Sequence, residues 1–148
     1  MDLTIDKPRS AKDKLAGLVS LKRVIDKAKA SNDGALGDYD YDCPHDKPLF
    51  AFLGTTGPEF ARKVKELQSD DAIADWVEAQ LLSQKSPEEV ARFNDDRMHW
   101  HPEPGSPSAE FFKNLRSQVA PGRDDIVTWF DVLDLDEGRS VPVATSLN

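Results

Sequence analysis

Apolar residues recur every three to four positions through most of this chain, which is the spacing of a helix that buries one face. The clearest example is the segment 21–30, and its stop signal lies in residues 31–34, where asparagine and glycine tolerate the left-handed conformation common at helix ends. We therefore expect a secure helix here. Its apolar stripe comprises Leu21, Val24, Ile25 and Ala28, whereas Lys22, Arg23, Lys27 and Lys29 are expected to project elsewhere.

Capping residues mark further helices along the chain. Ser10 can begin a short helix over residues 11–19, and Asp46 can cap one over residues 47–53. The Ser-Pro-Glu-Glu of residues 86–89 combines a proline in the first turn with a capping box. The remaining predicted helices cover residues 58–67, a segment that starts at Ser69, residues 108–119 with Ser106 or Ser108 as N-cap, and residues 126–135 opened by Asp124 and Asp125.

These elements predict an all-α fold, a single compact bundle-like domain of about seven helices that spans residues 1–148. The proline-rich residues 102–107 are expected to form a surface loop, because the roughly 40 residues after them are few for an independent domain. Residues 139–148 are expected to form a loosely ordered tail.

Residues 34–46 are the one stretch without a clean helical period. They hold the chain's single cysteine and both of its tyrosines among closely spaced aspartates. Because helix packing explains these residue choices least, we expect an ordered loop rich in Gly, Tyr and Asp, packed into the helical domain.

The net charge of -8 argues against nucleic-acid binding through the overall field, since phosphate recognition needs a concentrated basic surface. The charge is uneven, because residues 1–30 carry a net +4 and the rest a net -12. The basic start can dock on the acidic remainder, or it can form a site for an anion or a partner; the sequence leaves both open.

Compartment signals are few but agree with one another. No apolar run approaches the roughly 20 residues of a membrane span, so no membrane segment is expected. The first residues lack the apolar core of a secretory signal, and the single cysteine has no partner for an internal disulfide. We therefore expect a cytoplasmic protein.

Four residues have side chains that zinc could use: Cys43, His45, His99 and His101. Their Cys-x-His and His-x-His spacings are not those of paired zinc ligands, so neither a metal nor a cofactor is expected. Cys43 beside His45 could also act as a nucleophile, although an unpaired cysteine is more often a small buried hydrophobe.

Two functions follow from these residues. The first is a non-enzymatic binding or interaction module for an unknown small molecule or protein. The second is a thiol-dependent enzyme or redox-active protein in which Cys43 reacts and Asp46 or a basic neighbour tunes it. A homo-oligomer is a further option, with Trp100 and Trp129 as the residues to inspect. The candidate binding residues are Arg9, Arg23, Tyr39, Tyr41, Cys43 and Asp46.

Short motifs along nearly the whole chain form a specific set: Pro8-Arg9-Ser10, Leu36-Gly37-Asp38-Tyr39, Tyr41-Asp42-Cys43-Pro44 with Asp46, Ala120-Pro121-Gly122-Arg123 and Thr128-Trp129-Phe130-Asp131. In these motifs the chain resembles a bacterial family of small, mainly helical proteins known only as a domain of unknown function. The resemblance implies one compact domain and no established activity. In the family pattern the position of His45 is more typically leucine, which counts against a shared Cys-His metal or catalytic pair.

Overall fold

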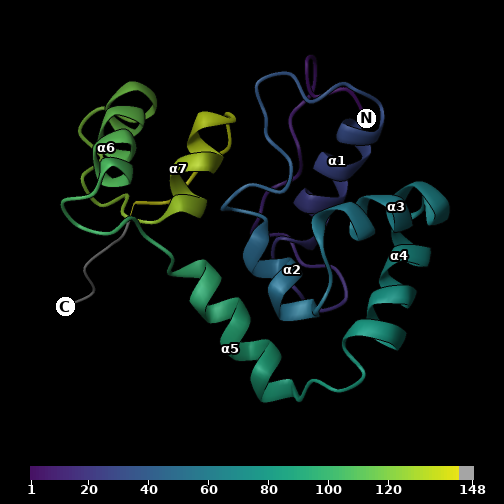
Figure 1. Ribbon diagram of the computed structural model, residues 1–148. Coiled ribbons are helices and arrows are strands. Elements are labelled where there is room, and N and C mark those ends of the chain that lie inside the picture. Colours follow the sequence, from purple (N-terminus) through teal and green to yellow (C-terminus); the bar gives the residue numbers. More distant parts are fainter. Residues whose placement is uncertain (144–148) are drawn as a thin grey trace. The chain divides into compact units, whose positions relative to one another are not determined.

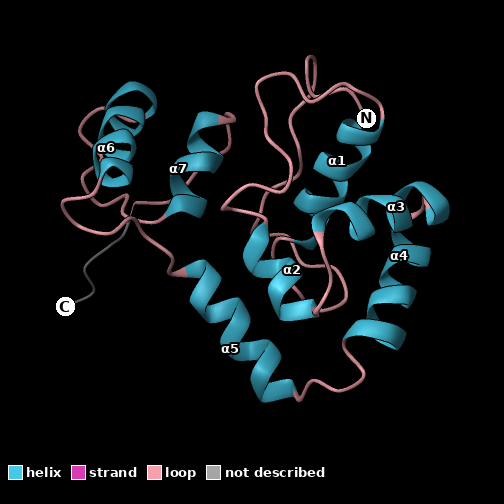
Figure 2. Ribbon diagram, viewed as in Figure 1, coloured by secondary structure: helices cyan, strands magenta, loops and turns pink. Residues whose placement is uncertain are grey.

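The computed structural model describes residues 1–143, and within them the protein is all-α, as predicted. Figure 2 shows helices joined by loops and turns, with no strand among the described residues. The elements are α1 (Leu21–Asn32), α2 (Lys47–Leu53), α3 (Gly57–Leu67), α4 (Asp70–Trp76), the π-helical turn η1 (Val77–Leu81), α5 (Pro87–Met98), α6 (Pro107–Val119) and α7 (Trp129–Asp136).

The chain divides into two compact units, Met1–Asn94 and Asp95–Asn148, and α5 runs through the boundary between them. The first unit holds α1 to α4 and η1, and the second holds α6 and α7. That all 148 residues form one domain stays a prediction. Each unit is described below by itself.

The core of the first unit forms where α1 packs against α3 (Figure 1). The apolar stripe of α1 is fully buried, as the helical spacing predicts. Phe60 of α3 is also fully buried, and its ring lies 5.4 Å from that of Phe50 in α2 and 6.0 Å from that of Trp76 in α4. Helices α2, α3 and α4 therefore share one aromatic centre.

Several helix starts follow the capping signals in the sequence. Ser69 and Ser106 each accept a hydrogen bond from the amide three residues ahead. At α5 the capping box forms in both directions, because the Glu89 amide donates to Ser86 Oγ and the Ser86 amide donates to Glu89 Oε1. These bonds satisfy amides that the first helical turn leaves without partners.

The predicted helix over residues 11–19 is wrong. The segment turns back on itself, and Leu15 and Leu18 exchange backbone hydrogen bonds of 3.1 and 2.9 Å. Ala16 and Gly17 between them have positive φ values of 53° and 74°, which a right-handed helix cannot contain. Asn94 of α5 holds this turn, because its side chain accepts from the Val19 amide and donates to the Gly17 carbonyl.

The last helix begins later than predicted, at Trp129 rather than Ile126. Thr128 is the N-cap and accepts from the Asp131 amide, whereas Asp125 forms an ion pair with Arg123 at 2.9 Å. The core of the second unit consists of Phe112, Ile126, Trp129 and Val132, with Trp100 packed against it.

The predicted proline-rich loop is shorter than 102–107, because Pro107 already belongs to α6. Of the predicted tail, residues 139–143 contain no helix or strand, and Arg123 donates to the carbonyls of Val141 and Pro142. The rest of the tail, residues 144–148, lies outside the described residues.

Candidate functional site

The 34–46 loop is attached to the first unit at both of its ends. At its start the Leu3 amide donates to the Ala35 carbonyl at 2.8 Å. Gly37 has a φ of 61°, and a Cβ atom at this position would lie 2.9 Å from the Leu3 carbonyl oxygen. The close approach of the first residues of the chain therefore requires glycine here.

At its other end, the loop is tied to α1 by a buried ion pair. Lys27 Nζ lies 2.9 Å from Asp46 Oδ1, and the two side chains are 5% and 2% exposed. The second carboxylate oxygen of Asp46 accepts the Asp42 amide at 2.9 Å. Both oxygens of Asp46 thus bond inside the protein.

This ion pair corrects two predictions. Lys27 does not project away from the core, because α1 is buried on nearly every side from Arg23 to Ala28. Asp46 precedes α2, yet its side chain makes no capping hydrogen bond there. The carboxylate turns instead toward the ammonium group of Lys27, since a charge buried this deeply requires an opposite partner.

Cys43 is partly exposed and shares the same cation. Lys27 Nζ lies 3.4 Å from Cys43 Sγ, within hydrogen-bond distance for sulfur. The Cys43 carbonyl accepts the amides of Asp46 and Lys47 at 2.8 and 3.0 Å, so a tight turn fixes the cysteine just before α2. The surroundings of the sulfur are therefore charged on at least one side and are not an apolar cage.

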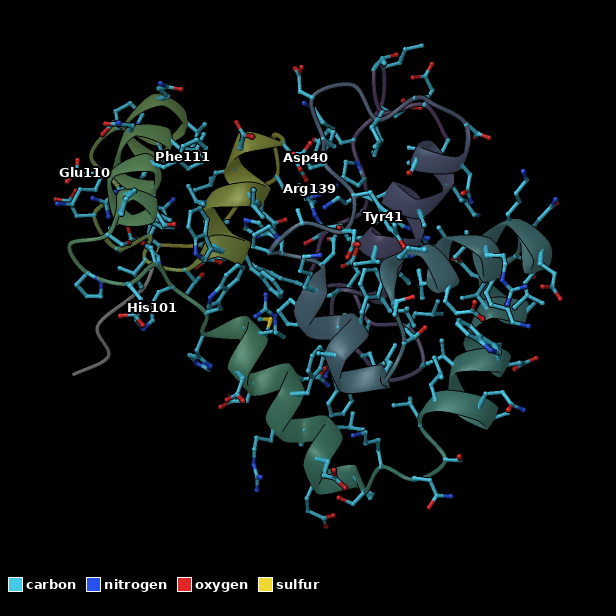
Figure 3. All side chains as sticks on the ribbon, viewed as in Figure 1. Asp40, Tyr41, His101, Glu110, Phe111 and Arg139 are labelled. Atoms are coloured by element: carbon cyan, nitrogen blue, oxygen red, sulfur yellow. The ribbon has the colours of Figure 1, made fainter. Side chains whose placement is uncertain are left out.

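The two tyrosines of the loop make different contacts. Tyr41 donates its hydroxyl to the Gly57 carbonyl at 2.7 Å and meets the ring of Phe50 edge-on at 5.8 Å. Burial, together with the nearby carboxylates of Asp46 and Asp42, raises the pKa of Tyr41 far above its ordinary value. Tyr39 lies under the guanidinium group of Arg23, 5.8 Å from the ring centre. Tyr41 and its neighbour Asp40 are labelled in Figure 3.

Asp42 has a structural role that the sequence did not reveal. Its backbone is left-handed, with a φ of 58°, and its carboxylate lies against the Cα atom of Gly57 at the start of α3. The helix dipole favours a negative charge at this end. Lys47 also pairs with this carboxylate at 3.0 Å. Any side chain larger than hydrogen at residue 57 would occupy the place of the carboxylate.

Arg9 forms a second network, separate from the Lys27 pair. Its Nη1 lies 2.6 Å from Asp70 Oδ2, and its Nε lies 3.0 Å from Asp26 Oδ2. The hydrogen bond to Asp70 raises the pKa of Arg9, and the same bond lowers the pKa of the Asp70 carboxyl group. Arg23 Nη1 donates to the Arg9 carbonyl at 3.3 Å. Arg9 therefore joins the N-terminal segment to α1 and α4.

Five of the six predicted residues fall into two groups, and Tyr41 belongs to neither because it contacts Gly57 and Phe50. Cys43 and Asp46 meet at Lys27, while Arg9, Arg23 and Tyr39 form a separate chain of contacts. Lys27 and Asp26 were missed, because no local pattern distinguishes a buried charged residue of a helix from a solvated one, and only the near-complete burial of α1 identifies them. Asp42 and Asp70 were missed because their contacts, with Gly57 and with Arg9, join segments that are separated in the sequence.

No metal-ligand cluster coincides with these residues in the described part of the chain. A cavity of about 380 Å³ lies elsewhere in the first unit, lined by Met1, Lys29, Asn32, Asp33, Val64, Lys65 and Gln68. No group of three or more His, Cys, Asp or Glu residues within residues 1–143 could hold a metal ion. His99 contacts the Asp95 side chain at 3.3 Å, and His101 contacts the Pro102 carbonyl at 3.1 Å.

The fold and site together define a small helical protein with a buried Lys-Asp pair beside a cysteine, and none of its described helices is long and apolar enough to cross a membrane. The chain belongs to the family described as "Domain of unknown function (DUF5069)", whose model matches residues 5–139. No curated protein matches the chain.

Proposed function

We propose that the protein is a non-enzymatic interaction module of the bacterial cytoplasm whose binding surface is the outer side of the 34–46 loop. One observation carries the proposal. The inward-pointing polar groups of Tyr41 and Asp46 are bonded inside the first unit, whereas Asp38 and Asp40 are exposed. The loop is thus held from within and leaves the carboxylates of Asp38 and Asp40 exposed; Asp40 is labelled in Figure 3.

A surface held in this way suits recognition, because a loop that is already ordered loses little conformational entropy on binding. The candidate residues Arg9, Arg23, Tyr39, Tyr41 and Asp46 support the loop from behind in this proposal. The outward charge favours a partner segment rich in lysine or arginine, through electrostatic complementarity.

The test measures association of a fluorescent oligolysine peptide with the full chain by anisotropy over a range of salt concentrations. The loop variant Asp38→Asn with Asp40→Asn should weaken association several-fold. The matched control, Asp75→Asn with Glu78→Gln, removes the same charge from exposed positions of α4 and η1 and should leave association nearly unchanged. Equal weakening in both variants, or no association at all, would refute the proposal.

The second candidate function is that of a thiol-dependent enzyme or redox-active protein. The distance of 3.4 Å between Lys27 Nζ and Cys43 Sγ favours it. A nearby cation stabilises a thiolate, which is the nucleophilic form of cysteine. Here Cys43 would be the reacting residue, and Lys27, held by Asp46, would be a positioning residue.

Alkylation with iodoacetamide tests this candidate. Native protein should react faster than the urea-denatured chain at the same pH, and Lys27→Gln should remove that difference. If the folded protein reacts more slowly than the denatured chain, the candidate is wrong.

A further inference from the structure

The contact between Lys27 and Cys43 joins two nucleophiles in one place. The nitrogen comes from α1 and the sulfur from the loop 16 residues later, and their separation of 3.4 Å leaves no room for an intervening atom. The lysine side chain is 5% exposed, whereas the cysteine is partly exposed. Cys43 is therefore the more accessible member of the pair, while the amine is enclosed beside it.

The chain has no second cysteine that could react with an oxidised Cys43, so the contact with Lys27 affects what oxidation would produce. An oxidised cysteine is usually protected by a second thiol, which condenses with the sulfenic acid to give a disulfide. This chain has a single cysteine, so an internal disulfide cannot form. Sulfenic acids also condense with nitrogen, and Lys27 Nζ is a nitrogen already in contact with the sulfur.

We propose that peroxide oxidation converts Lys27 and Cys43 into a reversible sulfur–nitrogen cross-link between α1 and the 34–46 loop. This cross-link does not depend on the interaction surface proposed above. It specifies the product that a reactive Cys43 would form.

The reaction balances in two steps. The Cys43 sulfur attacks hydrogen peroxide, so that an S–O bond forms, the O–O bond breaks and one water leaves. Asp46 then accepts a proton from the Lys27 ammonium group, with which it already shares a 2.9 Å hydrogen bond.

In the second step the amine attacks the sulfenic sulfur. The S–N bond forms, the S–O bond breaks and a second water leaves. One thiol, one amine and one peroxide thus give one S–N bond and two waters, and the two electrons that sulfur loses reduce the peroxide. A thiol reductant such as dithiothreitol reverses the change by cleaving the S–N bond.

The product would tie the loop covalently to the helix that it already contacts. A cross-link restricts the unfolded chain more than the folded one, so the oxidised protein should have a higher melting temperature than the reduced protein. The loop would then be fixed independently of the Lys27–Asp46 ion pair, which the reaction consumes.

Peptide mapping of the wild-type full chain tests the proposal. After treatment with a few equivalents of hydrogen peroxide, the peptides that contain Lys27 and Cys43 should appear as one joined species. Its mass should be about 2 Da below the sum of the two peptides, because two hydrogens are lost. Dithiothreitol should separate the pair.

Two variants test whether the amine of Lys27 is the group that joins to Cys43. Lys27→Arg keeps a positive charge beside Asp46 but lacks a nucleophilic amine, so Cys43 should proceed to sulfinic acid. Lys47→Arg changes an exposed lysine of the same loop region and should leave the joined species intact.

The proposal is overturned if wild-type Cys43 becomes sulfinic acid, stays reduced, pairs with a second molecule or joins to Lys47. The peptide map of the wild-type protein decides the question, so the test remains valid even if the Lys27 variant does not fold. Oligolysine association is measured on reduced protein, so the two proposals can fail separately.

Discussion

Removal of Lys27 by Lys27→Met should be among the most damaging single changes in the first unit. The substitution leaves the Asp46 carboxylate 2% exposed with the Asp42 amide as a remaining partner. Breaking a buried ion pair by removing one member costs about 3–5 kcal/mol, because the other charge stays buried without compensation. Urea unfolding should therefore show a lower midpoint at an unchanged slope.

A double-mutant cycle separates the ion pair from simple packing loss. In Lys27→Met with Asp46→Asn, the uncharged amide can still accept the Asp42 amide, so the double variant should lose less than the sum of the singles. The coupling should be about 1–3 kcal/mol, within the range seen for contacting residues. Additive losses would contradict the argument.

An exposed ion pair provides the control. Arg62 pairs with Glu59 at 2.6 Å, but its side chain is 58% exposed. Arg62→Met should leave the midpoint of urea unfolding nearly unchanged, because solvent screens this pair. If Lys27→Met costs no more than Arg62→Met, burial is not what makes the Lys27 pair important.

Three further predictions concern the other contacts of the site. Gly57→Ala places a methyl group where the Asp42 carboxylate lies and should lower the free energy of unfolding by about 1–3 kcal/mol, as measured by urea denaturation. The hydrogen bond from Arg9 lowers the pKa of Asp70 in the folded state below its usual 3.8. This bond therefore stabilises the folded protein above pH 3.8, and the stabilisation is lost as the pH falls through the folded-state pKa. When the free energy of unfolding is measured against pH, its decrease below pH 4 should therefore be smaller in Arg9→Met than in the wild type. An identical decrease in the two proteins would contradict this. Gly37→Ala should separate the loop from the N-terminal segment, seen as faster hydrogen exchange of the amides that pair them, with no change expected in amides of α3.

Local signals in the sequence were sufficient for most of the helices. The limits predicted for α2, residues 47–53, agree with the structure, and the capping box at residues 86–89 forms as expected. Such features depend on contacts between residues a few positions apart, which the sequence states directly. The apolar stripe of α1 likewise predicted the core, because burial of one helix face follows from its spacing alone.

Two local signals were overridden by distant residues. The segment 11–19 has a good N-cap and helical spacing, yet Asn94, far along the chain, captures its backbone in a turn. Asp46 is a good N-cap for α2, but the buried ammonium of Lys27 takes its carboxylate. A hydrogen bond to a buried charge is stronger than a bond to an exposed helix amide, so the longer-range contact prevails.

The sequence by itself determined that the protein is helical, where most helices begin and which residues are chemically suited to a site. Tertiary structure alone decided that Lys27 lies beside Cys43. The physical reason is the burial of α1 on almost every side, which brings its polar residues into contact with whatever segment covers them. Helical spacing records which residues share a face, but it does not record how many faces the rest of the chain will cover.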